Sequence, residues 1–132
     1  MDIFVFGSNL AGRHGAGAAL CAFCKHGAIY GQGGGIQGNS YGIPTKDGRL
    51  NTLDLHLIEQ HVWEFFRFAH SHPEMTFNVT PIGCGLAGYT PYEIAPMFAM
   101  CLKLPNIKLP ISFLEELEKR GSHSDDSDDI EE

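Results

Sequence analysis

The chain has 132 residues, a length that favours one domain, and a hydrophobic content of 43% is enough to build a core. It contains no apolar run of about 18 residues and no basic segment ahead of an apolar stretch, so we expect neither a membrane span nor a secretory signal. Four cysteines without an export signal indicate reduced thiols, as in a cytoplasmic protein.

The formal charge of −7 is concentrated at the C-terminal end. Residues 121–132 hold six acidic residues and no lysine or arginine, so removing six negative charges leaves −1 for residues 1–120. Such a body lacks the basic footprint of a protein that wraps nucleic acid. The Ser/Asp/Glu composition of residues 121–132 cannot bury apolar surface, and we predict a disordered acidic tail there behind a folded domain of residues 1–120.

Apolar patterns and glycine positions predict strands and helices in alternation. In chain order we expect a strand at 3–6, a helix at 16–25, strands at 28–30 and 40–45, a helix from 55 to about 70, a strand at 75–82, a helix from 91, a strand at 106–112 and a helix at 113–120. Strands interleaved with helices predict an α/β sheet with helices on both faces.

The helices predicted to begin at residues 55 and 91 carry the clearest local signals. Apolar residues spaced three or four apart predict an amphipathic helix that Asn51 or Thr52 would cap. Thr90 and Glu93 match a capping box, with a proline at the first helical position, so a helix begins there. Pro96 lies inside that helix and should bend it.

Two glycine-rich segments, residues 7–17 and 83–91, each lead from a predicted strand into a predicted helix. Helix N-termini and exposed amides bind phosphate without lysine or arginine, which suits a nearly neutral body. The alternative is that both are ordinary turns. Residues 33–38 match GxGxxG, but a strand follows them instead of a helix, so they are not a dinucleotide fingerprint.

The cysteines predict no metal site. Cys21 and Cys24 form a CxxC on one face of a predicted helix, without a second ligand pair, so packing is the expected role and a metal or redox site is the alternative. Cys84 lies in a glycine loop close to a helix start, a setting that lowers a thiol pKa, so a nucleophilic cysteine is an alternative there. Backbone geometry explains that loop equally well.

Three blocks, in order, resemble macrodomains. Arg13-His14-Gly15-Ala16-Gly17-Ala18-Ala19 is similar to their loop-helix segment. Ile43-Pro44-Thr45-Lys46, then a helix, then Pro81-Ile82-Gly83-Cys84-Gly85-Leu86, resembles the branch with the terminal ADP-ribose protein glycohydrolase and the antitoxin macrodomains that remove ADP-ribose from DNA. The resemblance covers roughly residues 2–113 and implies an N-terminally shortened, three-layer α/β/α macrodomain-like sandwich with a mixed sheet.

The resemblance also implies an ADP-ribose pocket and a catalytic lysine. Lys46 matches the lysine that opens the distal ribose at its anomeric carbon and forms a lysyl adduct. An amine can do so only after losing its proton, which burial or a nearby cation favours and the adjoining Asp47 opposes. The ligand-binding residues implied are Gly7, Ser8, Asn9, His14, Gly15, Ala16, Gly17, Gly83, Cys84, Gly85, Leu86, Ala87 and Gly88.

The sequence therefore leads to a hydrolase that removes ADP-ribose from a macromolecule, with no cofactor and no metal. Its partners would be ADP-ribose or an ADP-ribosylated macromolecule, with nucleic acid only as a modified substrate and no membrane. The glycohydrolase has an aspartate where this chain has Ala87, so the alternative is a non-catalytic module that binds or sequesters ADP-ribose or a related nucleotide. A third class, an interaction protein whose acidic tail imitates nucleic-acid charge, rests on the tail alone.

Overall fold

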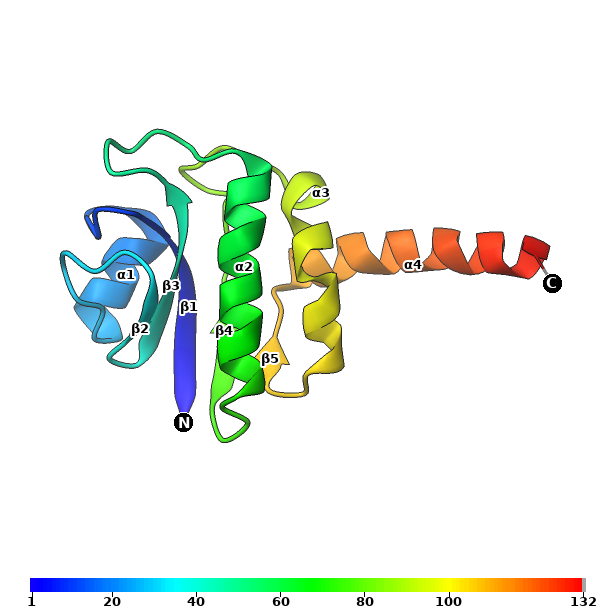
Figure 1. Ribbon diagram of the computed structural model, residues 1–132, viewed down its shortest axis with the longest axis horizontal. Coiled ribbons are helices and arrows are strands. Elements are labelled where there is room, and N and C mark those ends of the chain that lie inside the picture. The colour runs from blue at the N-terminus through cyan, green and yellow to red at the C-terminus, as the bar shows by residue number, and fades with distance from the viewer. Residues whose placement is uncertain (132) are drawn as a thin grey trace.

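The computed structural model describes the backbone of residues 1–131 and the side chains of residues 1–121. In this part of the chain a five-stranded mixed sheet, in the order β2-β3-β1-β4-β5, is flanked by helices on both sides (Figure 1). The elements are β1 Asp2–Asn9, α1 Gly17–Lys25, β2 Gly35–Gln37, β3 Ser40–Lys46, α2 Leu55–His70, β4 Thr76–Val79, α3 Pro91–Ile94, the 3-10 helix η1 Ala95–Lys103, β5 Ile107–Lys108 and α4 Ile111–Glu131. The predicted α/β alternation is confirmed.

The central strand β1 explains the layers. It pairs in parallel with β3 on one side and with β4 on the other, and its side chains alternate between the two faces of the sheet. Ile3 and Val5 join the larger core with α2 and η1, whereas Phe6 packs against Ala19 and Ala22 of α1. Helix α1 thus covers one face, and α2 with η1 covers the other (Figure 1).

Helix α2 confirms the amphipathic pattern, because Ile58, Val62, Phe65 and Ala69 are all buried against the sheet. Burying an apolar side chain of this size stabilises a fold by about 1.5–3 kcal/mol. The predicted caps were wrong: the N-cap residue is Asp54, which makes no side-chain capping bond.

Residues 28–30 form no strand, which corrects the second predicted strand. Ile29 and Tyr30 are more than half exposed, and they belong to a loop that the side chain of Gln37 holds by accepting from the Ile29 amide at 2.8 Å. The strand instead runs from Gly35 to Gln37 and pairs antiparallel with β3. This one antiparallel pair makes the sheet mixed.

The last strand is shorter than predicted. β5 covers only Ile107–Lys108, because Pro110 cannot donate to a strand ladder and α4 begins immediately after it. The backbone of α4 is helical to Glu131, and Figure 1 shows it extending away from the body. The predicted acidic tail, residues 121–132, has almost all its side chains outside the described part, so its disorder stays a prediction. No helix within residues 1–131 is long and apolar enough to cross a membrane.

Pro96 interrupts its helix as expected. The α-helix ends at Ile94 and the chain continues as the 3-10 helix η1. A residue without an amide hydrogen cannot donate to the carbonyl of Tyr92, four positions earlier. Arg120 of α4 supplies that bond instead, donating from Nη2 to the Tyr92 oxygen at 2.9 Å.

Candidate functional site

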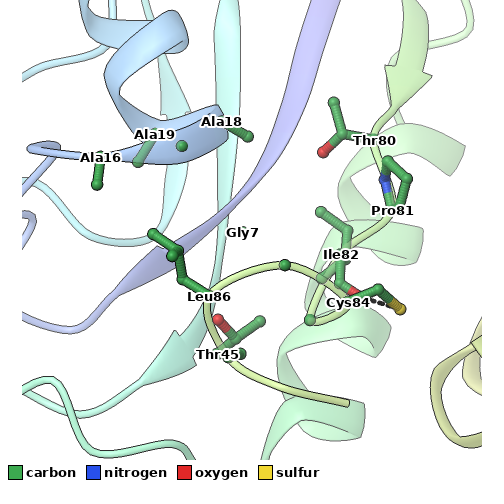
Figure 2. A pocket seen from close by; sticks show the side chains of 14 residues that line it. Gly7, Ala16, Ala18, Ala19, Thr45, Thr80, Pro81, Ile82, Cys84 and Leu86 are labelled. Atoms are coloured by element: carbon green, nitrogen blue, oxygen red, sulfur yellow. Dashed lines mark hydrogen bonds between the residues drawn. The ribbon is translucent and has the colours of Figure 1, made fainter. Parts of the chain in front are cut away.

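The two glycine-rich corners lie together at the C-terminal ends of β1 and β4, where they line one cavity of about 310 Å³ (Figure 2). We call it the loop cavity. Its lining residues are Gly7, Ala16, Gly17, Ala18, Ala19, Thr45, Thr80, Pro81, Ile82, Gly83, Cys84, Gly85, Leu86 and Ala87. The structure therefore brings together two segments that are more than 60 positions apart in the sequence.

At the first corner, α1 begins without a side-chain cap. Its N-cap residue is Ala16, which has no side-chain acceptor, and the first helical amides, from Gly17 to Ala19, find no partner among the described residues. These amides carry the positive end of the helix dipole. Gly17 has φ +58, a left-handed conformation that favours glycine, whereas a Cβ there would only make ordinary van der Waals contact with Leu86 Cδ1, at 3.4 Å.

At the second corner, a tight loop presents consecutive free amides. The turn is held by the Gly88 amide, which donates to the Gly85 carbonyl at 3.1 Å, and by Thr52, whose hydroxyl donates to the Ala87 carbonyl at 3.0 Å. The amides of Gly85, Leu86 and Ala87 have no partner in the described part of the chain. Successive unpaired amides in a turn form a concave site for an anion.

The helix that follows this second loop contributes nothing to the cavity, which corrects the expectation that both helix N-termini would bind phosphate. The Thr90 hydroxyl accepts from the Glu93 amide at 3.4 Å, and Glu93 Oε1 accepts from the Thr90 amide at 3.0 Å. This capping box satisfies the start of α3 from within. At the second corner, therefore, the loop amides and not the helix dipole are available to bind an anion.

A second cavity of about 360 Å³ adjoins the first, and we call it the lysine cavity. Its lining residues are Gly7, Ser8, Asn9, Arg13, Gly15, Ala16, Ala19, Tyr30, Thr45, Lys46, Leu50 and Leu86. Leu86, which is 68% exposed, lines both cavities, and Figure 2 shows its side chain reaching from the loop toward α1. The two cavities therefore meet beneath Leu86.

Lys46 stands at the end of β3, half-buried, with its carbonyl fixed by the Leu10 amide at 2.9 Å. The neighbouring Asp47 is engaged elsewhere: its Oδ1 accepts from the amides of Asn51 at 2.9 Å and Arg49 at 2.8 Å. These bonds hold the pKa of the Asp47 carboxyl below its usual value. Among the side chains of residues 1–121, Lys46 has no ion-pair partner.

Asn9 shapes the entrance of the lysine cavity. Its Nδ2 donates to the Arg13 carbonyl at 2.9 Å and its Oδ1 accepts from the Arg13 amide at 2.9 Å, so one side chain closes a loop of four residues. Arg13 and Lys46 both line this cavity. Arg13 belongs to the macrodomain-like block, but its own role was not predicted.

His14 is fully buried and lines neither cavity, which corrects its assignment to the ligand-contacting set. Its Nε2 lies 2.9 Å from the Ile29 carbonyl and 3.2 Å from Gln37 Oε1. Both neighbours accept, so we assign the imidazole hydrogen to Nε2. His14 therefore supports the Gly15 loop from behind. Gly88 also lies outside both linings, and its part is to close the second loop.

Cys84 lines the loop cavity in surroundings that disfavour its thiolate. Burial, with a smaller contribution from the charge of Glu93, raises the pKa of its thiol to about 11. The Sγ atom lies 3.5 Å from the Ile82 carbonyl, to which it donates. A protonated thiol does not attack carbon, so the alternative of a catalytic cysteine loses its support.

Several lining residues carried no signal in the sequence. Thr80 also lines the loop cavity, although the sequence placed it only near the end of a predicted strand, and Pro81 and Ile82 of the macrodomain-like block line it without having been assigned a ligand contact. Tyr30 was placed in a strand that does not form, yet it lines the lysine cavity. Neither cavity has an aspartate or glutamate in its lining, and the described side chains form no cluster of three or more ligands suited to a metal ion.

Comparison with known proteins gives no further guide. No protein-family model, no curated protein and no solved structure matches this chain.

Proposed function

We propose that the chain binds ADP-ribose across the two adjoining cavities, with a macrodomain-like mode of recognition. One observation carries the proposal: two sets of unpartnered amides, from Gly17 to Ala19 and from Gly85 to Ala87, line the same cavity. Amides at a helix N-terminus and in a concave turn favour a phosphate group without a basic side chain. The lack of a carboxylate in either lining supports an anionic ligand, because nothing there repels it.

The distal ribose then belongs in the lysine cavity, and the reaction proposed is removal of ADP-ribose from a macromolecule. The neutral amine of Lys46 attacks the anomeric carbon, and the bond to the attached macromolecule breaks. Water then hydrolyses the lysyl adduct, releasing ADP-ribose and restoring the amine. Two features support this role: Lys46 and Arg13 line the same cavity, and neither an aspartate nor a glutamate lines it.

The second candidate is a module that binds ADP-ribose without turning it over. The observation that favours it is the absence of any aspartate or glutamate from both linings, where the resembling glycohydrolase has an aspartate in place of Ala87. A hydrolytic step gains from a carboxylate that activates water. Here water would have to react without one.

The binding proposal is tested by calorimetric titration with ADP-ribose, using a pair of glycine variants. A Cβ on Gly85 would meet nothing within 4 Å and its φ is not left-handed, so Gly85→Val fills the loop cavity without straining the fold. Affinity should fall roughly tenfold or more. Gly48 has the same freedom outside both cavities, so Gly48→Val should bind like the wild type. Equal affinities for the two variants would remove the loop cavity from the site.

Lys46→Ala separates the two candidates. A hydrolase loses turnover of an ADP-ribosylated substrate while calorimetry still detects the bound ADP-ribose, since the diphosphate amides are unchanged. A binder shows no turnover in the wild type either. Lys46→Arg is the matched control, because arginine keeps the charge but does not act as a neutral amine at pH 7. Turnover that survives in both variants would exclude the lysine mechanism.

A further inference from the structure

The end of the loop cavity that lies away from Lys46 is chemically different from the lysine cavity. The lysine cavity holds Asn9, Arg13 and Lys46, groups suited to a hydroxyl-rich sugar. The proposed function gives the amides of residues 17–19 and 85–87 to the diphosphate and the lysine cavity to the ribose, so the nucleoside is left for the remaining wall of the loop cavity. That wall consists of Ala18, Thr80, Pro81, Ile82, Gly83 and Cys84, all but Gly83 labelled in Figure 2. The Cys84 thiol already donates to the Ile82 carbonyl at 3.5 Å. The inference below rests on the proposed function.

The side chains of this wall have no donor left for a nucleobase. Ala18, Pro81 and Ile82 have apolar side chains. The Thr80 hydroxyl donates to the Val5 carbonyl at 2.7 Å, and Thr45, the other hydroxyl in the loop cavity, donates to the Ser8 carbonyl at 3.3 Å. Since a hydroxyl has a single hydrogen to give, neither can donate to a bound base.

The main-chain amides of residues 80–82 are also already paired or absent. The Thr80 amide donates to the Val5 carbonyl at 3.0 Å, the Ile82 amide donates to the Thr80 carbonyl at 2.7 Å, and Pro81 has no amide hydrogen. The amides of the cavity without a partner in the described part of the chain are those of the α1 start, of Gly83 and of residues 85–87. The proposed function gives those of the α1 start and of residues 85–87 to the diphosphate, which leaves the single amide of Gly83. No donor on residues 80–82 remains to face the acceptor atoms of a base edge.

Strong selection between bases needs such groups. A site rejects a wrong ligand by a large factor when that ligand leaves a buried polar group of the site unpaired, whereas an apolar wall contacts different ligands almost equally. Every nucleobase presents a similar apolar face. We propose that the loop cavity accepts the nucleoside end of its ligand without distinguishing the base, so that the ligand class is nucleoside diphosphates linked to ribose in general.

One small difference between bases remains. The Thr80 oxygen keeps lone pairs that can accept a hydrogen from an exocyclic amine, which adenine, guanine and cytosine have and uracil does not. No charged side chain lines the loop cavity to enlarge this effect. Thr80→Val removes the lone pairs and should bring the affinity for a uracil nucleotide level with the others.

The test is a competition titration in which bound ADP-ribose is displaced by ADP, GDP, CDP and UDP. The expected result is four dissociation constants that agree within about tenfold, and within about threefold in Thr80→Val. If ADP-ribose binds and the affinity for ADP is more than tenfold higher than the affinities for GDP, CDP and UDP, the inference is wrong while the proposed function stands. It is equally wrong if ADP-ribose binds and none of the four displaces it.

A different outcome identifies a failure of the proposed function. If ADP-ribose produces neither heat nor a thermal shift, and the four diphosphates produce none, then the cavity is not a diphosphate site and the inference falls with it. Gly85→Val is the control for location: it should weaken all four diphosphates by the same factor, because it obstructs the cavity and not a base edge. Loss of one diphosphate alone would contradict a base-indifferent wall.

Discussion

Helices α1 and α3 both follow a glycine-bearing loop at the C-terminal end of a parallel strand, yet their first amides are treated differently. At α3, Thr90 and Glu93 satisfy the orphan amides by a reciprocal pair of bonds. At α1, the N-cap residue is Ala16, and the amides of the first turn are left for something else. A missing cap costs a helix about 1 kcal/mol, and the uncapped amides that line the cavity are left to water or to a ligand.

The largest effect should come from giving α1 the cap that it lacks. In Ala16→Asp the carboxylate accepts from the first-turn amides and brings a negative charge to the place proposed for the diphosphate. A charge about 4 Å away near a protein surface is worth about 4 kcal/mol, so ADP-ribose affinity should fall roughly 100-fold or more. The free energy of unfolding should rise by about 0.5–1 kcal/mol. Calorimetry and urea denaturation measure the two quantities.

Ala16→Gly is the matched control, since it adds neither a charge nor a side-chain acceptor. Its affinity should stay close to that of the wild type. If Ala16→Asp stabilises the protein but binds ADP-ribose unchanged, the α1 amides do not contact the ligand.

The opposite change at α3 should separate stability from binding. Thr90→Ala removes one half of the capping box, so the free energy of unfolding should fall by about 1 kcal/mol, while ADP-ribose affinity stays the same because this helix start does not line either cavity. Thermal and urea unfolding give the first quantity and calorimetry the second. An affinity that falls along with stability would mean that the second corner needs its helix as well as its loop.

The smallest effect concerns thiol chemistry at the second corner. A pKa of about 11 in place of 9.0 leaves roughly 100-fold less thiolate on Cys84 at pH 8 than on an ordinary thiol. Iodoacetamide should therefore label the exposed Cys24 first, and labelling of Cys84 should rise as the pH approaches 11. Mass spectrometry of the labelled peptides gives both rates. Rapid labelling of Cys84 at pH 7 would restore the nucleophilic-cysteine alternative.

The sequence predicted those parts of the fold whose causes are local. The capping box links Thr90 and Glu93, three positions apart, and the stripe of α2 repeats every three or four residues, so both were visible without a structure. Residues 28–30 look like a strand because Ile29 and Tyr30 are apolar. What holds this segment in a loop is Gln37, whose side chain comes from a strand that composition does not reveal.

In the candidate site, too, local features were predictable from the sequence and long-range contacts were not. Glycine spacing located both corners, but it could not show which amides already donate to another residue. The Thr80 amide donates to the Val5 carbonyl in a tertiary bond, and the Ile82 amide donates to the Thr80 carbonyl within a turn. His14 looked like a ligand contact because it lies in the first loop. Its burial depends on Gln37, 23 positions later, and that contact leaves no local trace.

The most direct measurement is an amide ¹H–¹⁵N correlation spectrum of the protein recorded during titration with ADP-ribose. The amides of Gly17, Ala18, Gly85, Leu86 and Ala87 should shift together and saturate with one dissociation constant, since hydrogen bonds to phosphate move an amide proton strongly. The amides of Glu93 and Ile94, at the capped start of α3, should move little. Shifts that saturate elsewhere, with these five amides unmoved, would contradict a diphosphate held between the two loops.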